Sequence, residues 1–372
     1  MRRLLCAVAA ALAWTATAQA AAPNPTARAF YVVNASTGDV LAARDARVAV
    51  PIASITKLMT VIVALDHLQP SDVVTVTARA ARVGESRIPL VAGQRITVQD
   101  LLQGALVQSA NDAADALADA AAGGDTPLFI SWMNGRAQQL GLRDTHFARA
   151  DGLDAPGHVS SARDVAVLAE AAMRLPIVRS IVRERTATIE NGRVVLHTWD
   201  DLLGVFPGLI GVKTGHTGDA GWCQVAAVRR LGYTIYAVVL GSPTRTQRND
   251  DLERLLAWST SQYRSRLLVR HATYAHALLG YGRAPVALVA AAPIMRVVRI
   301  GRPFLERVIA PSAVSLPVRR GERLGRVEIW AGKRLVGSQP LVAARSVSRP
   351  GLGGRLRWYA SRTIHHLLGV FS

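Results

Sequence analysis

The stretch Ala53-Ser54-Ile55-Thr56-Lys57-Leu58-Met59-Thr60 places a serine three residues before a lysine. Apolar residues recur at helical spacing from Ser54 to Leu68, which predicts a helix over this segment. Residues i and i+3 share one face of a helix, so the Lys57 amine can reach the Ser54 hydroxyl. A serine is a weak nucleophile until a neighbouring base removes its proton. The stretch therefore predicts a nucleophile together with its base.

Two short motifs follow farther along the chain, Ser109-Ala110-Asn111 and Lys213-Thr214-Gly215. Each occurs often by chance, but their order, separated by about 50 and then about 100 residues, is far more specific. A lysine acts as a base only if burial or a nearby positive charge lowers its pKa. Lys213, if folded close to Lys57, would supply such a charge.

Lysine is scarce in this chain: only Lys57, Lys213 and Lys333 among 44 basic residues, the rest being arginine. Arginine cannot deprotonate in a protein, so it cannot act as a base at position 57. A sequence biased towards arginine that keeps lysine in both motifs is consistent with a chemical requirement for lysine there.

With these motifs the chain resembles the serine-type D-Ala-D-Ala carboxypeptidases, which are low-molecular-mass penicillin-binding proteins. The residues that carry the likeness, beyond the first stretch, are Gln108-Ser109-Ala110-Asn111-Asp112-Ala113, Thr145-His146-Phe147, Ser160-Ser161-Ala162-Arg163-Asp164 and Gly211-Val212-Lys213-Thr214-Gly215-His216-Thr217. The likeness covers nearly all of the chain after residue 20. One departure is Arg149-Ala150-Asp151-Gly152, where the family often has Asn-Pro-x-Gly.

The resemblance implies an α/β fold: a β-lactamase/transpeptidase-like catalytic domain with an antiparallel sheet flanked by helices and a helical subdomain. A small β-rich domain and a C-terminal amphipathic helix would follow. We therefore expect a signal peptide at 1–20, the catalytic domain at 21–263, the β-rich domain at 264–347 and a membrane-anchoring tail at 348–372. No cofactor and no metal ion is expected.

The resemblance also implies a role for each motif residue. Ser54 would attack the carbonyl between two D-alanines, Lys57 would accept its proton, and Ser109 would relay a proton to the leaving amine. The expected substrate-binding residues are Asn111 for the substrate backbone, Lys213 for positive charge, Thr214 and Arg248 for the terminal carboxylate, and Gly215 and His216. The backbone N–H groups of Ser54 and His216 would form the oxyanion hole.

Local patterns predict further elements. Alternation from Ala29 to Leu41 predicts a hairpin that turns at Ser36-Thr37-Gly38-Asp39. Helices are expected at 97–107, with Thr97 as the N-cap, and at 112–122, 160–173 and 250–263. Strands are expected at 181–189, 222–228 and 233–240, and a hairpin at 324–331 and 335–343 across Gly332-Lys333-Arg334.

The N-terminus reads as an export signal, with Arg2 and Arg3 before an apolar run and a small-x-small site at Ala18-Gln19-Ala20. Its removal would leave Cys223 as the one cysteine, so no intrachain disulfide is expected. Cys223 itself is expected to be a buried apolar residue and not a nucleophile.

The net charge of +18 is concentrated at one end, because residues 263–372 hold 19 basic and three acidic residues. Residues 354–371, drawn as a helix, have one broad apolar face that Arg357 interrupts. Such a segment can lie in the membrane interface, where anionic lipids attract arginines. We expect attachment to the periplasmic face of the inner membrane; nucleic acid is disfavoured as a partner by export and the absence of a recognition motif.

Three alternatives remain at this stage. A DD-endopeptidase that cleaves cross-links would use the same residues. A β-lactamase is disfavoured because no Glu-x-x-Leu-Asn sequence lies between Asn111 and Lys213. A non-catalytic wall-binding protein is disfavoured by the intact Ser54 and Lys57. The leading hypothesis is a carboxypeptidase that trims peptidoglycan stem pentapeptides and is inhibited by β-lactams.

Overall fold

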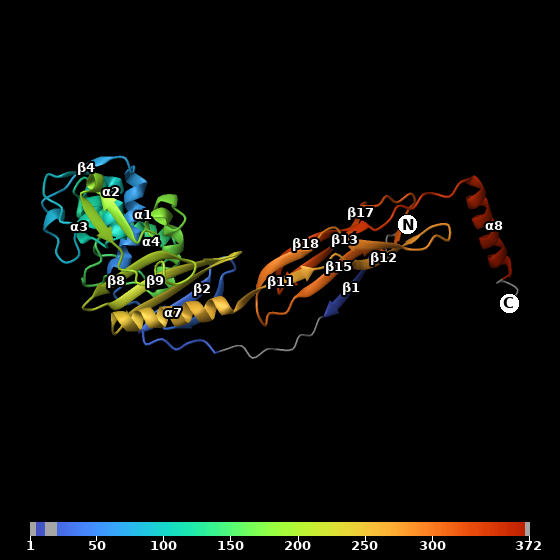
Figure 1. Cartoon of the computed structure of the whole chain (residues 1–372), viewed down its shortest axis with the longest axis horizontal. Helices are drawn as coiled ribbons and strands as arrows, with labels where there is room; N and C mark the ends of the chain where they lie inside the picture. The colour runs from blue at the N-terminus through green and yellow to red at the C-terminus, as the bar shows by residue number, and fades with distance from the viewer. Residues whose placement is uncertain (1–4, 12–20, 369–372) are drawn as a thin grey trace. The chain divides into compact units, whose positions relative to one another are not determined.

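The computed structural model describes residues 5–11 and 21–368 (Figure 1). The chain divides into two compact units. The first, which we call the N-terminal unit, is Ala20–Ser261; the second, the β-rich unit, is Gln262–Ser372 together with Met1–Gln19. Each unit has its own cluster of buried apolar side chains.

A five-stranded antiparallel sheet forms the centre of the N-terminal unit. Its strand order is β3 (Asp39–Arg44), β2 (Ala29–Asn34), β10 (Tyr233–Ser242), β9 (Gly221–Arg230) and β8 (Leu209–Thr217). The structure confirms the predicted first hairpin and the strands predicted at 222–228 and 233–240. Strand β8, which carries the Lys213-Thr214-Gly215 motif, had not been predicted as a strand, and it lies at an edge of the sheet.

Helices cover this sheet and build a helical subdomain (Figure 1). They are η1 (Ala53–Thr56), α1 (Lys57–His67), η2 (Ala80–Arg82), α2 (Val98–Leu106), α3 (Asn111–Ala121), α4 (Thr126–Gln139), α5 (Ala162–Ala172), α6 (Pro176–Ile181), η3 (Glu190–Gly192) and α7 (Arg245–Ser261). Thr97 caps α2 by accepting a hydrogen bond from the backbone N–H of Asp100, as predicted. Two small two-stranded antiparallel sheets pair β4 (Val73–Thr75) with β5 (Arg95–Thr97) and β6 (Thr186–Ile189) with β7 (Val194–His197).

Two predicted boundaries were wrong. The strand predicted at 181–189 begins only at Thr186, because α6 extends from Pro176 to Ile181. Proline at the first helical position favours a helix start, since its fixed φ suits the first turn and its missing N–H has no helical partner to lose. The last helix of the unit begins at Arg245, five residues before the predicted start at Asp250.

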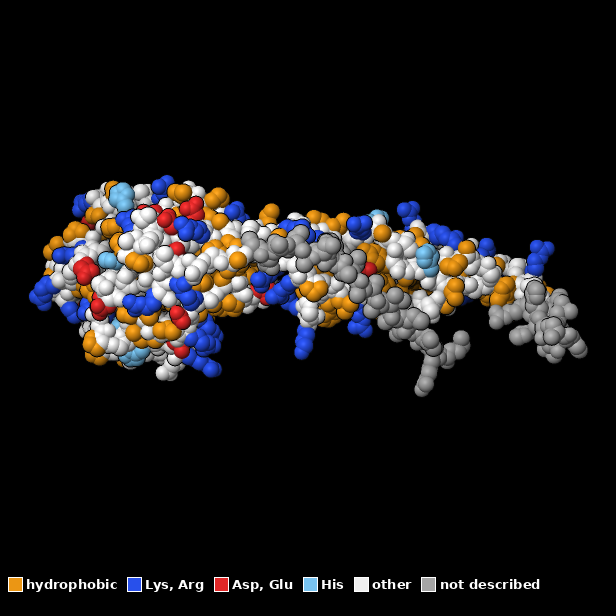
Figure 2. Space-filling model, turned by 90° about the horizontal axis from the view of Figure 1, so that it is seen from below, with side chains coloured by type: hydrophobic (Ala, Val, Ile, Leu, Met, Phe, Trp, Pro, Cys, Tyr) orange, Lys and Arg blue, Asp and Glu red, His pale blue; other side chains and the backbone are white. Residues whose placement is uncertain are grey.

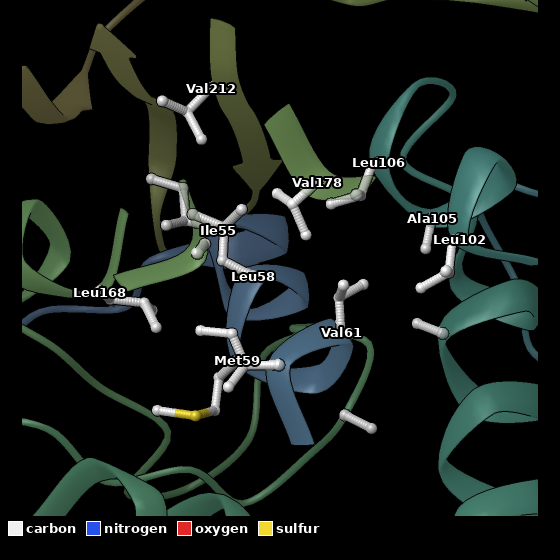
Figure 3. Close-up of a cluster of buried hydrophobic side chains, with 14 of the residues drawn as sticks. Ile55, Leu58, Met59, Val61, Leu102, Ala105, Leu106, Leu168, Val178 and Val212 are labelled. Atoms are coloured by element: carbon white, nitrogen blue, oxygen red, sulfur yellow. The ribbon is translucent and has the colours of Figure 1, made fainter. Parts of the chain in front are cut away.

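Helix α1 lies in the core of the N-terminal unit and packs against helices α2, α3, α4 and α5. Eight of its 11 residues are buried, and Leu58, Met59 and Val61 are fully buried. Figure 3 shows Val61 on the side of α1 that faces Leu102 of α2, and Met59 on the opposite side, towards Leu168 of α5, with further apolar side chains from α6 and β8. Burying one such side chain stabilises a fold by about 1.5–3 kcal/mol. Because α1 is held on several sides, Ser54 and Lys57 at its N-terminal end have fixed positions.

The β-rich unit contains a seven-stranded sheet with the order β1-β15-β17-β18-β13-β12-β16 and the two-stranded pair β11-β14. The bounds are β1 (Leu5–Ala11), β11 (Tyr263–Val269), β12 (Thr273–Leu279), β13 (Val286–Ala290), β14 (Ile294–Arg299), β15 (Leu305–Pro311), β16 (Ala313–Val314), β17 (Arg323–Ala331) and β18 (Arg334–Ala343). The predicted hairpin across Gly332-Lys333-Arg334 is β17 and β18. Most of the predicted signal segment lies outside the described residues; its central part is β1, paired with β15.

The C-terminal segment forms helix α8 (Leu352–Leu368). Leu352, Leu356 and Tyr359 are 77%, 70% and 55% exposed, so apolar side chains of this helix are solvent-facing. In the space-filling view, acidic and basic side chains mix on the N-terminal unit, whereas basic ones outnumber acidic ones on the β-rich unit (Figure 2). Among the described residues, no helix has the length and apolarity needed to cross a membrane.

Candidate active site

Lys57 is hydrogen bonded to three oxygen atoms. Its Nζ lies 2.7 Å from Ser54 Oγ, 2.7 Å from Asn111 Oδ1 and 2.5 Å from the backbone oxygen of Asp151. The side chain is fully buried. Burial lowers the Lys57 pKa to about 8, although the negative charge of Asp151 and of more distant acids opposes this shift. The neutral form of Lys57 is therefore reached nearer to neutral pH than that of a free lysine.

Ser109 and Lys213 form a second pair. Lys213 Nζ donates to Ser109 Oγ at 2.7 Å and to the backbone oxygen of Thr214 at 2.9 Å. Burial holds the Lys213 pKa well below its usual range, and the positive charge of Lys57 lowers it further. The sequence predicted that the charge of Lys213 would lower the pKa of Lys57, but burial is the cause that lowers it, and the charge effect acts in the other direction, from Lys57 on Lys213. Ser109 has a φ of +65°, a conformation that costs energy outside glycine and is often found at functional sites.

Asn111 begins α3 and connects three parts of the site. Its Oδ1 accepts from Lys57, its Nδ2 donates to the backbone oxygen of Gly84 at 3.0 Å, and its N–H donates to the backbone oxygen of Ser86 at 2.8 Å. The sequence predicted a contact with substrate for this residue. The structure adds that Asn111 orients Lys57 and holds the loop at 84–86.

The motif on β8 packs directly against the serine. A Cβ atom added to Gly215 would lie 3.0 Å from the backbone nitrogen of Ser54 and 3.0 Å from the backbone oxygen of Ile52. Glycine at 215 therefore allows the strand to approach the nucleophile. Beside it, the His216 ring contacts the Trp222 ring in a tilted arrangement, with 4.1 Å between ring centroids and 32° between the ring planes.

Arg248 comes from α7 and is buried, with 1% of its surface exposed. Its guanidinium donates to Asp201 Oδ2 at 3.0 Å and to Asn249 Oδ1, and lies 5.7 Å from the centroid of the Trp222 ring. These contacts hold the Arg248 guanidinium in one orientation. The sequence-based prediction of Arg248 as a site residue was the least specific of the set, since arginine is abundant, and the structure places Arg248 in the lining of the same pocket as Ser54.

These residues surround one pocket of about 210 Å³. Seven predicted residues line it: Ser54, Ser109, Asn111, Thr214, Gly215, His216 and Arg248. Lys57 and Lys213 are buried and contact the lining serines from within the protein. Sequence reasoning missed five lining residues, Glu85, Ser86, Leu153, Trp199 and Trp222, none of which belongs to a motif.

The described part of the chain contains no group of three or more His, Cys, Asp or Glu residues placed to hold a metal ion. Cys223 is buried, and burial raises the pKa of its thiol to about 12. A thiol that stays protonated is a poor nucleophile. The chemistry of the pocket therefore centres on the two serines and two lysines.

Known proteins are similar to this chain in sequence. The family model described as D-alanyl-D-alanine carboxypeptidase matches residues 16–244. The chain is 31% identical to the D-alanyl-D-alanine carboxypeptidase DacC of Escherichia coli over 369 residues, which covers 94% of this chain and 91% of that protein. It is 32% identical to DacD of Salmonella typhimurium over 366 residues, with 91% of each chain covered.

Solved structures give the same result. Penicillin-binding protein 5 of Haemophilus influenzae is 27% identical, with a TM-score of 0.64 over 89% of this chain and all of that one. A mutant form of the DD-transpeptidase of Streptomyces K15 is 31% identical, with a TM-score of 0.60 over 64% of this chain and 99% of that one. The chain belongs to the D-alanyl-D-alanine carboxypeptidase family of serine-type peptidases, and its N-terminal unit has the penicillin-binding fold.

Proposed function

We propose that this chain is an exported serine DD-carboxypeptidase that removes the terminal D-alanine from peptidoglycan stem pentapeptides and is acylated by β-lactams at Ser54. One observation carries the proposal. A neutral lysine keeps two N–H bonds, and two fixed acceptors, Asn111 Oδ1 and the Asp151 carbonyl, are present to receive them. The remaining lone pair of Lys57 then faces Ser54 Oγ and can accept its proton.

Acylation follows from this geometry. Ser54 Oγ forms a bond to the carbonyl carbon between the two D-alanines while its proton moves to Lys57 Nζ. The backbone N–H groups of Ser54 and His216 stabilise the oxyanion, where loss of one donor typically costs about 3–4 kcal/mol. The C–N bond then breaks, and Ser109, held by Lys213, relays a proton to the leaving amine nitrogen.

Deacylation restores the enzyme. Lys57 takes a proton from a water molecule, the resulting hydroxide attacks the ester carbonyl, and Ser54 Oγ leaves with a proton. At the other end of the pocket, Thr214 and Arg248 bind the terminal carboxylate of the substrate. A β-lactam enters the same steps, but its leaving nitrogen stays attached to the acyl group, so the acyl-enzyme persists.

Labelling with a fluorescent penicillin tests the proposal. We expect covalent labelling of the wild type and none of Ser54→Ala, and release of free D-alanine from a pentapeptide by the wild type only. Equal labelling of both proteins would contradict the mechanism. Cleavage of cross-linked dimers would indicate endopeptidase activity, and rapid turnover of the β-lactam would indicate a β-lactamase.

We further propose that residues 1–20 direct export and that the tail from 348 onward attaches the enzyme to the periplasmic face of the inner membrane. The exposed Leu352, Leu356 and Tyr359 of α8, together with the basic charge of the β-rich unit, support this attachment. Deletion from Arg349 onward should release the enzyme from anionic vesicles and leave D-alanine release intact. Unchanged sedimentation with vesicles would contradict the anchor.

A further inference from the structure

Glu85 is a carboxylate in the wall of the active-site pocket that the mechanism above does not use. Its φ is +62°, a left-handed conformation that a residue with a Cβ atom rarely adopts. Among the described residues, no hydrogen bond or ion pair to the Glu85 side chain is present. Glu85 therefore combines an unfavourable backbone conformation with an unpaired charge in the pocket that Ser54 also lines.

The basic side chains near Glu85 are engaged elsewhere. Arg87 donates to the backbone oxygen of Ala81 and lies 3.9 Å from the Asp112 carboxylate. Arg149 forms a two-point ion pair with Asp151, and Lys57 has its three acceptors already. The Glu85 charge raises the pKa of both Lys57 and Arg149, but neither of them contacts it. The carboxylate is therefore available to a cation that enters the pocket.

The position of Glu85 is fixed relative to Asn111. Asn111 donates hydrogen bonds to the backbone oxygens of both neighbours of Glu85, Gly84 and Ser86. The family resemblance implies that Asn111 binds the substrate backbone, and Asn111 is linked to Ser54 through their shared hydrogen bonds with Lys57. An extended peptide advances at most about 3.3–3.6 Å per residue, so the residue just upstream of the two D-alanines lies within side-chain reach of Glu85.

Two residues of opposite charge line the pocket. Arg248 offers a positive charge for the terminal carboxylate, and Glu85, whose two neighbours in the chain are hydrogen bonded to Asn111, offers a negative charge. We propose that Glu85 forms a subsite for the free side-chain amine of a diamino residue that precedes the D-Ala-D-Ala terminus. This inference rests on the proposed function and assigns a substrate preference to the same pocket. A stem peptide whose amine has been joined to a neighbouring stem would lose this contact.

A pair of peptides that differ only in this charge tests the subsite. The peptides are Nα-acetyl-L-Lys-D-Ala-D-Ala, with a free ε-amine, and its Nα,Nε-diacetyl form. Because Glu85 is exposed, we expect a preference of about three- to fivefold in kcat/KM for the free amine, the size of an exposed ion pair. Glu85→Gln keeps the length of the side chain and its backbone strain, and it should reduce the ratio to about one.

The ratio of the two peptides removes any effect of the substitution on Lys57, since both peptides use the same base. Glu253→Gln is the matched control, because it removes an exposed carboxylate from α7 that does not line the pocket, and it should keep the wild-type ratio. A wild-type ratio of one, or a ratio that Glu85→Gln leaves unchanged, would overturn the subsite.

Binding to the Ser54→Ala protein separates this inference from the proposed function. Calorimetric titration should give three- to fivefold tighter binding of the free-amine peptide, and Glu85→Gln in the Ser54→Ala background should abolish the difference. A binding difference without D-alanine release by the wild type would refute the proposed function and support the subsite. Release of D-alanine without any binding difference would refute the subsite alone.

Discussion

Arg149 and Asp151 form a two-point ion pair, with 2.9 Å from Nε to Oδ1 and 2.6 Å from Nη2 to Oδ2. Asp151 is fully buried, whereas Arg149 is partly exposed. The backbone oxygen of the same aspartate accepts a hydrogen bond from Lys57. The ion pair therefore holds a carbonyl that orients Lys57, the base in the proposed mechanism, and the carboxylate adds a negative charge that acts on Lys57. It occupies the position where the sequence departs from the family's frequent Asn-Pro-x-Gly.

The Asp151 charge should set the pH range of acylation. Among the charges that act on Lys57, Asp151 raises its pKa most, and the net pKa is about 8. Asp151→Asn removes the charge and keeps an oxygen that can accept from the N–H of Leu153. The Lys57 pKa should fall, so the neutral base forms at lower pH. We expect the acidic limb of the acylation rate with benzylpenicillin to move below pH 8 in this variant. A midpoint that stays at the wild-type pH would contradict the electrostatic role.

Arginine should not be able to replace Lys57 as the base in acylation. Lys57→Arg keeps a positive charge but cannot lose a proton, and base catalysis typically contributes about 10²–10⁴-fold to a rate. We expect a loss of that size in the acylation rate, measured with fluorescent penicillin. Lys333→Arg, at an exposed turn between β17 and β18, is the matched control and should acylate like the wild type. Acylation by Lys57→Arg within tenfold of wild type would refute Lys57 as the base.

Arg248 should recognise the terminal carboxylate of the substrate. Its guanidinium is buried and oriented by Asp201 and Asn249. A hydrogen bond to a charged group is worth about 1.5–3 kcal/mol, so Arg248→Gln should lower kcat/KM about 10- to 100-fold for a peptide that ends in a carboxylate. The same peptide with a C-terminal amide should lose much less. Arg254→Gln, exposed on the same helix, should change neither value. Equal losses for both peptides in Arg248→Gln would assign Arg248 a structural role.

The features that were predicted correctly from the sequence are those that depend on residues close together in the chain. A spacing of three residues on a helix places Ser54 beside Lys57, and the structure gives 2.7 Å between the two side chains. The cap at Thr97 is equally local, because its side chain bonds to a backbone N–H three residues later. Such features need no knowledge of how distant segments meet.

Local sequence patterns could not predict contacts between segments that are far apart in the chain. Ser109 and Lys213 meet across 104 residues, and only the resemblance to a family implied that they share a site. Glu85 and Trp199 entered the pocket unpredicted, since a single glutamate or tryptophan in a loop carries no periodic signal. The ion pair between Arg149 and Asp151 lies in the loop where the family pattern fails, so the resemblance gave no guide to it.

Glycine should be required at position 152 because Gly152 packs closely against the backbone of Ala53, the residue before Ser54. Gly152 and Gly93 both have a φ of +84°, but their surroundings differ. A Cβ on Gly152 would lie 2.8 Å from the Ala53 carbonyl carbon and closer still to its oxygen, whereas a Cβ on Gly93 would meet nothing within 4 Å. Gly93→Ala should therefore lower the free energy of unfolding by about 1–2 kcal/mol, from the unfavourable φ alone.

Gly152→Ala adds a clash with backbone atoms, and overpacking typically costs a further 1–3 kcal/mol. The clash falls on the residue before Ser54 and on the residue after Asp151, so the alignment of Ser54 with Lys57 should also change. We expect urea unfolding to show a loss of about 2–5 kcal/mol, and folded Gly152→Ala protein to acylate at least tenfold more slowly than Gly93→Ala. Equal losses of stability and equal acylation rates in the two variants would contradict this prediction. The left-handed backbone would then be the whole reason for glycine at 152, and the close packing of Gly152 against Ala53 would contribute nothing to catalysis.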